Sequence, residues 1–350
     1  GFRFQDFNDD TFNAKLNFSY DMSFLTKGLN FSGYANFTRT WGNTRDFIGT
    51  YTYYTLDFDT GEYISHLGFP EDDEIGPNSS QVSMSQTQTD FYHARLSYDR
   101  SFGDHSISAF AAFETNEYKS TYLFGYKQDL PGIDTPYIWA GATDGSQDTN
   151  EAIIEKGRVN YFGAISYNYA NKYLVDFSIR HDGSFNFPKD KRFGTFPGLA
   201  AGYRISNEPF MQEINWLDDL KFRASYAEMG NDVVDPFQYV GKYEYDYGYS
   251  FGIDPTTENG LYPSSFPNPN ITWEVSRMQN YGFDVTAFKG LLNMSADYFI
   301  EKRENILLPR SAEVPAYTGL TLPDENFGKV NNSGFELLVN HTNNKGKLKY

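Results

Sequence analysis

The chain has 350 residues, a formal net charge of −17 and no cysteine. The lack of cysteine excludes a disulfide framework, a thiolate metal site and a cysteine nucleophile. The acidic balance argues against nucleic acid as a partner, because nucleic-acid binding rewards basic clusters. Hydrophobic residues make up 39% of the chain and aromatic residues alone 18%. A soluble core of this size normally holds a larger share of aliphatic side chains.

We expect no membrane-spanning helix in this sequence, and its first residues do not resemble a signal peptide. No apolar run approaches the roughly 18 residues that a membrane-spanning helix needs. The first residues, GFRFQDFNDD, have neither the basic region nor the apolar stretch of a signal peptide. If the protein crosses a membrane, it therefore does so with strands.

Period-two alternation begins in the first segment and recurs along the chain. Apolar residues at positions 12, 14, 16, 18 and 20 alternate with polar residues between them. The same pattern returns at 29–38, 92–99, 107–113, 160–169, 220–226 and 292–301. We count about twelve such segments, each near the 9 to 11 residues that a tilted strand needs to cross a bilayer. Helical periodicity is confined to a short stretch at 208–218.

The connections between these segments alternate in length. Short links fall at 21–26, 101–104, 170–172, 289–290 and 342–346, and long ones at 41–87, 117–155, 230–272 and 305–327. Successive antiparallel strands send their connections to opposite ends, so short turns gather at one rim and long loops at the other. Outer-membrane barrels have short periplasmic turns and long extracellular loops. The sequence thus predicts an all-β, antiparallel transmembrane barrel.

The composition of the two strand faces favours a membrane over a soluble sandwich, propeller or jelly roll, in which the apolar face packs against protein. Tyrosines at segment ends are typical of rings at a lipid headgroup boundary: Tyr20, Tyr98, Tyr169 and Tyr173. The opposite face carries charged residues: Lys15, Arg95, Arg180, Arg223, Asp284 and Glu301. We therefore expect the apolar face to meet outer-membrane lipid and the polar face to border an interior.

Several ordered stretches resemble the barrel of SusC/RagA-type TonB-dependent outer-membrane transporters. They are VNYFGAISYNYANKYLVDFSIRHDGSFNF, RFGTFPGLAAGYRISNEPFM, WLDDLKFRASYAEMGND, NPNITWEVSRMQNYGFDVTAFKGLLNMSADYFIEKRENIL and NFGKVNNSGFELLV. Trp273, Glu274, Asn331, Gly334 and Glu336 match the family pattern. The resemblance covers residues 158–339, whereas residues 1–156 agree only in strand character.

The resemblance implies a barrel of 22 strands that encloses an N-terminal plug. The sequence accounts for about twelve strands and shows neither a plug-like region nor a TonB box. A sheet with open edges in lipid would leave backbone groups unpaired. We therefore expect residues 1–350 to be part of one transmembrane β-barrel domain, with the plug domain and the remaining strands outside this chain.

The resemblance also implies a function that is not enzymatic. Such a transporter resides in the outer membrane of a Gram-negative bacterium and imports nutrient oligomers, with glycans favoured and peptides second. Its implied partners are a SusD-like surface lipoprotein that acts as a lid and TonB, which acts through the missing plug. Two alternatives stay open: a passive outer-membrane pore, and a β-rich surface binding protein.

Candidate contact residues are aromatic and lie in the long loops: Tyr137, Trp139, Tyr243, Tyr245, Tyr247, Tyr249 and Phe251. Exposed rings stack on sugars or pack against peptide and protein partners. The alternative is that they fold the loops onto one another. The five histidines are scattered, so we expect no catalytic residue and no metal site among them. Acidic stretches at 57–62 and 71–74 could hold a loop calcium, but a hairpin turn explains the first better; we expect no other cofactor.

Overall fold

The computed structural model describes residues 2–68, 78–132, 134–143, 145, 147–251, 256–310, 322–342, 344–345 and 348–349. Eleven strands form one sheet, in the order β1-β2-β5-β6-β7-β8-β9-β10-β13-β14-β15. They are β1 (Phe2–Asp21), β2 (Leu29–Gly49), β5 (Ser79–Phe102), β6 (His105–Lys127), β7 (Asp148–Tyr169), β8 (Tyr173–Ser184), β9 (Phe193–Arg204), β10 (Leu217–Asn231), β13 (Glu274–Ala287), β14 (Leu292–Leu308) and β15 (Glu325–His341).

Three two-stranded ribbons complete the strands: β3 (Tyr51–Leu56) with β4 (Tyr63–Gly68), β11 (Lys242–Phe251) with β12 (Thr256–Ser265), and β16 (Asn344–Lys345) with β17 (Leu348–Lys349). The remaining elements are short 3-10 helices: η1 (Ile138–Ala140), η2 (Ile205–Asn207) and η3 (Pro209–Met211). The last two of these helices, η2 and η3, lie near the predicted helical stretch 208–218. Within the described ranges, no helix is long and apolar enough to cross a membrane.

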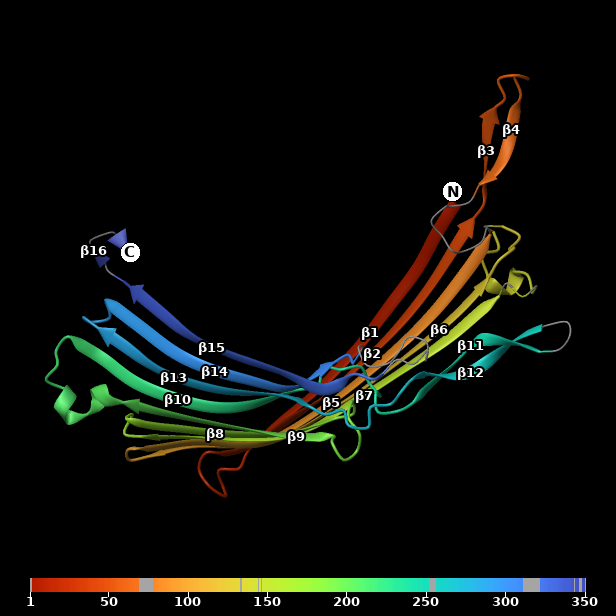
Figure 1. Cartoon of the computed structure of the whole chain (residues 1–350). Helices are drawn as coiled ribbons and strands as arrows, with labels where there is room; N and C mark the ends of the chain where they lie inside the picture. The colour runs from red at the N-terminus through yellow and green to blue at the C-terminus, as the bar shows by residue number, and fades with distance from the viewer. Residues whose placement is uncertain are drawn as a thin grey trace. The chain divides into compact units, whose positions relative to one another are not determined.

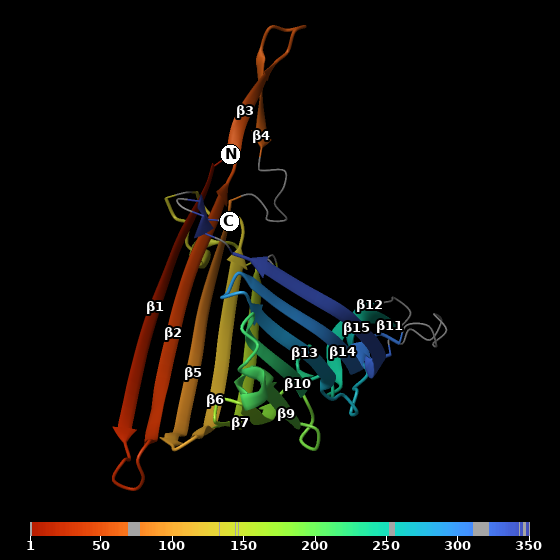
Figure 2. The same cartoon turned by 90° about the vertical axis from the view of Figure 1, so that its left-hand side faces the viewer.

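The chain comprises two compact units. The first contains Gly1–Asn17, Tyr34–Tyr92 and Asn116–Gly157, and the second contains Phe18–Gly33, His93–Thr115 and Arg158–Tyr350. Figure 2 shows β1, β2, β5 and β6 side by side, and Figure 1 shows the same for β13, β14 and β15. Each pairing from β7 to β10 and from β10 through β13 to β15 is antiparallel. The prediction of an all-β antiparallel wall is confirmed.

The strands are longer than the alternation predicts. The shortest in the large sheet have 12 residues, and β5 has 24. At about 3.3 Å per residue, β5 extends about 80 Å, whereas the hydrocarbon core is about 30 Å thick. The part of a strand outside the bilayer needs no apolar face, so its sequence loses alternation although its backbone stays paired. For this reason the predicted loops 41–87 and 117–155 are partly strand.

The first four predicted short links lie where the sequence places them, whereas the β16–β17 ribbon occupies part of the predicted link 342–346. Between β7 and β8, Ala170 and Asn171 have φ of 51° and 55°, as a two-residue hairpin turn requires. In the long link after β2, residues 57–62 close the β3–β4 hairpin. The Asp57 amide donates to the Glu62 carbonyl at 2.8 Å, and the Gly61 amide donates to the Asp57 carbonyl at 2.8 Å. The hairpin interpretation of this acidic stretch is confirmed.

The register places apolar side chains in rows on one face of the sheet. One row crosses six strands through Val175, Ala201, Ala224, Tyr281, Tyr298 and Phe335. A second passes through Phe222, Phe283, Ala296 and Leu337. Most large residues in these rows are exposed, with Phe335 at 68% and Tyr281 at 51%, while Phe283 is partly buried. Exposed apolar rows of this kind match a surface that meets lipid.

The opposite face of the same strands carries charge. Arg223 donates to both carboxylate oxygens of Asp284, at 3.0 and 3.1 Å, and to Asp297 Oδ2 at 2.8 Å. It also donates to Ser295 Oγ at 2.9 Å. Arg223 lies one residue from Phe222, whose side chain is in the apolar row. The predicted division into an apolar and a polar face is therefore present.

A tyrosine cluster marks the end of the sheet that bears the short turns. The rings of Tyr173 and Tyr203 stack with centroids 5.2 Å apart. Glu208 accepts hydrogen bonds from Lys172 Nζ at 3.0 Å, Tyr173 at 3.0 Å and Tyr203 at 3.2 Å. The hydrogen bond from Lys172 is the main cause that lowers the pKa of Glu208 below its usual value. Such a ring cluster fits the headgroup boundary.

Candidate functional site

In the first unit, the link between β6 and β7 is tied to the sheet by backbone contacts. The Leu130 amide donates to the Asn78 carbonyl at 2.9 Å, and Ser80 Oγ donates to the Pro136 carbonyl at 2.8 Å. Leu130 and Ser80 are buried. These contacts fix Leu130 and Pro136, and residues 137–140 follow directly from this anchor.

The anchored link presents two predicted contact residues as a pair. Tyr137 and Trp139 have ring centroids 6.4 Å apart and an interplanar angle of 14°. Trp139 is 74% exposed and Tyr137 43%. The guanidinium of Arg45, on β2, lies over the Tyr137 ring at 4.7 Å from its centroid. The structure therefore brings Tyr137 and Trp139 together and adds Arg45, which the sequence analysis did not identify.

In the second unit, the β11–β12 hairpin carries the other predicted residues. Tyr243 pairs with Pro263 and Tyr245 with Leu261, so these four residues share one face. Tyr243, Tyr245 and Leu261 are exposed. Tyr247, Tyr249 and Phe251 continue the β11 backbone, but their side chains lie outside the described part of the chain. The register of the hairpin shifts between Asp246 and Tyr249.

A small apolar core supports the loops of this unit. Phe187, Phe196, Ile271 and Trp273 are buried together. The Trp273 ring lies 5.1 Å from that of Phe187 and 5.3 Å from that of Phe196, between centroids. Trp273 Nε1 also donates to the Arg192 carbonyl at 3.3 Å. The core joins the link between β8 and β9, and Phe196 on β9, to the segment before β13.

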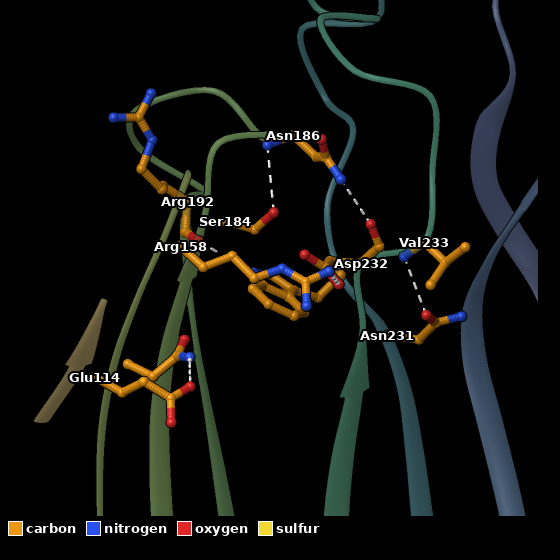
Figure 3. Close-up of polar contacts among 10 residues, drawn as sticks. Glu114, Arg158, Ser184, Asn186, Arg192, Asn231, Asp232 and Val233 are labelled. Carbon is orange, nitrogen blue, oxygen red and sulfur yellow. Dashed lines mark hydrogen bonds and ion pairs between the residues drawn. The ribbon is translucent and has the colours of Figure 1, made fainter. Parts of the chain in front are cut away.

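Buried polar contacts fasten the same loops (Figure 3). Asn186 Nδ2 donates to the Asp232 carbonyl at 2.8 Å, and the Asn186 amide donates to Ser184 Oγ at 3.3 Å. Arg158, on β7, donates from Nη2 to Asp232 Oδ1 at 2.7 Å. Asp232 is only 7% exposed. A carboxylate this buried needs a charged partner, because unpaired buried charge is costly.

Replacing Arg158 with alanine should loosen this fastening. The buried Asp232 carboxylate would lose its ion pair, at a cost of about 1 to 3 kcal/mol. We expect faster amide exchange in residues 185–192 and 232–240, measured by hydrogen–deuterium exchange. The double variant Arg158→Ala, Asp232→Asn removes the uncompensated charge and should recover part of the protection. Unchanged exchange in Arg158→Ala would contradict the structural role of this pair.

Asparagines hold the link after β12 against neighbouring strands. The Asn268 amide donates to the Gln238 carbonyl at 2.7 Å, and Asn268 Nδ2 donates to the Asp324 carbonyl at 2.6 Å. Asn326, on β15, accepts from the Thr272 amide at 2.9 Å and donates to the Thr272 carbonyl at 3.0 Å. Nothing in the sequence marks Asn268 and Asn326 as anchors, although both lie in stretches that carry the resemblance.

The acidic stretches offer limited support for an ion. Asp57 Oδ1 accepts the Asp59 amide at 2.9 Å and the Thr60 amide at 3.4 Å. The backbone hydrogen bond from Asp59 is the main cause that lowers the pKa of Asp57. Residues 71–74 lie outside the described ranges. Where the structure describes side chains, no group of three or more His, Cys, Asp or Glu is placed to hold a metal.

The antiparallel sheet, its exposed apolar rows and its charged opposite face define the wall of an outer-membrane β-barrel. The family described as TonB dependent receptor-like, beta-barrel matches residues 1–348. The chain belongs to this family. It is part of an integral outer-membrane protein of the SusC/RagA type, which Gram-negative bacteria carry. The resemblance seen in the sequence is confirmed.

Individual relatives agree with this assignment. The chain is 30% identical over 250 residues to TonB-dependent receptor P3 of Formosa agariphila, covering 71% of this chain and 24% of the relative. It is 34% identical over 185 residues to TonB-dependent receptor SusC of Bacteroides thetaiotaomicron, covering 52% and 18%. The RagAB peptide importer in its closed-closed state has a similar fold, with TM-score 0.74 and 20% identity over 98% of this chain and 35% of that one.

The chain thus spans about a quarter or less of the length of these two curated relatives. The relatives bear the names of receptors and an importer, in agreement with the expectation of a protein that is not an enzyme. Activity, cargo and partners belong to the whole protein and are taken up as proposals.

Proposed function

We propose that the whole protein imports nutrient oligomers across the outer membrane, with glycans the favoured cargo and oligopeptides second. Membership of the TonB-dependent receptor family supports the transport class. The observation that favours glycans is the exposed, nearly parallel pair Tyr137 and Trp139. Aromatic faces stack on sugar rings, and their rigidity keeps the entropic cost of binding low.

The wall described above would contribute three features to import. Its apolar rows would hold the wall in the lipid bilayer, and its charged face would line the interior with polar side chains. Its loops, which hydrogen bonds and packing hold in place, would expose the aromatic rings to cargo. The energy would come from TonB, acting on a plug that belongs to the rest of the polypeptide. A SusD-like lipoprotein would close over the loops as a lid. The resemblance of the fold to the RagAB peptide importer keeps oligopeptides as the second cargo class.

Replacing Trp139 with alanine should weaken glycan capture by the full-length protein about tenfold or more. Truncating an aromatic hot-spot residue costs about 2 kcal/mol, and 1.4 kcal/mol corresponds to a factor of ten. The measurement is uptake of fluorescently labelled oligosaccharides by cells that carry either variant in place of the wild-type gene. Trp216→Ala, at another exposed tryptophan, is the matched control and should leave uptake unchanged.

The outcomes separate the proposed function from its alternatives. A deletion strain that takes up every glycan and peptide tested at the wild-type rate would contradict import of nutrient oligomers. A steady open channel of the purified full-length protein in planar bilayers would favour a passive pore instead. Release from membranes by carbonate without detergent would favour a surface binding protein. Equal uptake by Trp139→Ala and wild-type cells would remove the ring pair from the cargo site.

A further inference from the structure

Arg45 beside the ring pair has a charge that the described residues leave uncompensated. Its guanidinium lies over Tyr137, 4.7 Å from the ring centroid. The adjacent carboxylate, Asp46, is engaged by Arg3, whose Nε donates to Asp46 Oδ1 at 3.1 Å. Of the described carboxylates, none forms an ion pair with Arg45. Within the described ranges, Arg45 therefore carries a positive charge at the ring pair with no carboxylate paired to it.

The stacking geometry prepares Arg45 to bind an anion at its edge. A guanidinium that stacks on a ring uses its face and leaves its N–H donors in the plane free. The Nε of Arg45 is buried and has no hydrogen-bond acceptor among the described residues, so the donors left for a ligand are those on Nη1 and Nη2. An arginine stays charged at every physiological pH, and its fork of donors matches carboxylate and phosphate-like anions in two parallel hydrogen bonds.

The two rings next to this cation add a requirement of their own. Trp139, 74% exposed, offers a broad flat face, and its ring centroid lies 6.4 Å from that of Tyr137, over which the Arg45 guanidinium stacks. A ligand that satisfies all three residues needs a flat, weakly polar face and an acidic group at its edge. A free inorganic anion lacks the face, and a neutral sugar lacks the charge. The chain's net charge of −17 repels anions in general. This repulsion further weakens the binding of anions that gain no stacking energy from the rings.

We propose that Arg45, Tyr137 and Trp139 form a subsite for acidic sugars, that is, for glycans whose units carry a carboxylate or a sulfate ester. The proposal rests on the proposed function and narrows its substrate class. The sugar ring stacks on Trp139 and Tyr137, and the acidic group accepts from Arg45. Carboxylates and sulfate esters both present two oxygens that can accept parallel hydrogen bonds. The subsite therefore recognises the negative charge and its position on the sugar. An acidic protein surface could also meet Arg45, but it would not need an exposed indole face.

The test compares charged and neutral glycans on the same backbone. The probes are oligogalacturonate against its fully methyl-esterified form, and fucoidan against desulfated fucoidan. Affinity is measured for the purified full-length protein by gel retardation and by calorimetry. We expect at least one charged probe to bind about 10- to 100-fold more tightly than its neutral match, as a charge-assisted hydrogen bond predicts. The pair that shows the preference identifies carboxylate or sulfate.

Variants test whether the preference for charged glycans depends on Arg45. Arg45→Gln should abolish the preference and leave the weaker neutral binding, whereas Arg45→Lys, which keeps charge without the fork, should retain part of it. Arg100→Gln, at an exposed arginine near a short turn, is the matched control and should bind as the wild type does. An unchanged thermal transition would show that Arg45→Gln is folded. Raising the salt concentration should weaken only the Arg45-dependent component.

Several outcomes would overturn the acidic-sugar subsite. They are equal affinity for both members of each pair, a preference that survives in Arg45→Gln, and no binding of any charged probe. Weaker association with a lipoprotein partner in Arg45→Gln, with glycan binding unchanged, would assign the cation to a protein contact instead. In each case import could persist, because uptake by the deletion strain tests the proposed function separately.

Discussion

Replacing Leu337 with arginine is expected to destabilise the folded protein in a bilayer by up to about 2 to 4 kcal/mol, the cost of arginine on a lipid-facing strand at the bilayer midplane, which falls toward the interfaces. Leu337 lies on β15 in the row that contains Phe283 and Ala296. It is 56% exposed, so in water the substitution would be nearly neutral. The measurement is reversible unfolding of the full-length protein in lipid vesicles by denaturant.

The next residue provides a matched control. Leu338 is 59% exposed and points to the opposite, charged face, in register with Ser295. Leu338→Arg introduces the same side chain at almost the same exposure on the same strand, but on the wet face. We expect its stability to stay within about 0.5 kcal/mol of wild type, as for an ordinary surface substitution. Equal effects of the two substitutions would contradict the assignment of the lipid face.

Replacing Trp273 with alanine should open the outer loops of the second unit. The residue is 7% exposed and packs on Phe187 and Phe196. Truncation of a buried aromatic residue costs about 3 to 5 kcal/mol through lost burial and the cavity left behind. Because the core joins loop segments, we expect the loss to fall on them first. Residues 185–192 and 266–273 should lose hydrogen-exchange protection and become sensitive to protease.

A second tryptophan controls for the loss of an indole. Trp216 is 55% exposed and stacks on Phe288 with centroids 5.9 Å apart. Trp216→Ala should leave exchange in both loop segments at the wild-type rate. Loss of protection spread evenly over β8, β9 and β10 in Trp273→Ala would show that the core belongs to the sheet as a whole. Unchanged exchange in the loops would contradict their dependence on this core.

The wall could be predicted because lipid imposes a simple rule on sequence. Within the bilayer one face must be apolar, so positions 220–226 and 292–301 alternate strictly and gave correct strands. Outside the bilayer both faces are wet. The stretch SSQVSMSQTQTD at the start of β5 therefore carries polar residues on both faces. Its sequence does not reveal that its backbone is paired in the sheet. Strand limits were therefore set too short.

The loop surface could be predicted in part. Ring side chains in polar loops stand out by composition, which identified Tyr137 and Trp139. Arg45 did not stand out, because its relation to Tyr137 depends on β2 meeting a link more than eighty residues later. Asn186 and Asp232 were missed for the same reason, since each is an ordinary turn residue until the fold buries it. The shift in register on β11 could not be predicted either, because it leaves no mark in the sequence.

The great length of the strands has a thermodynamic consequence for whatever the loops bind. β2 continues to Gly49 and β6 to Lys127, so both reach well toward the link that carries Tyr137. A capture surface mounted on long flexible tethers would have to give up much conformational freedom upon association. Here most of that freedom has already been lost during folding. Ligand binding at Tyr137 and Trp139 should therefore be favoured by enthalpy, with a small entropic penalty and a fast association rate.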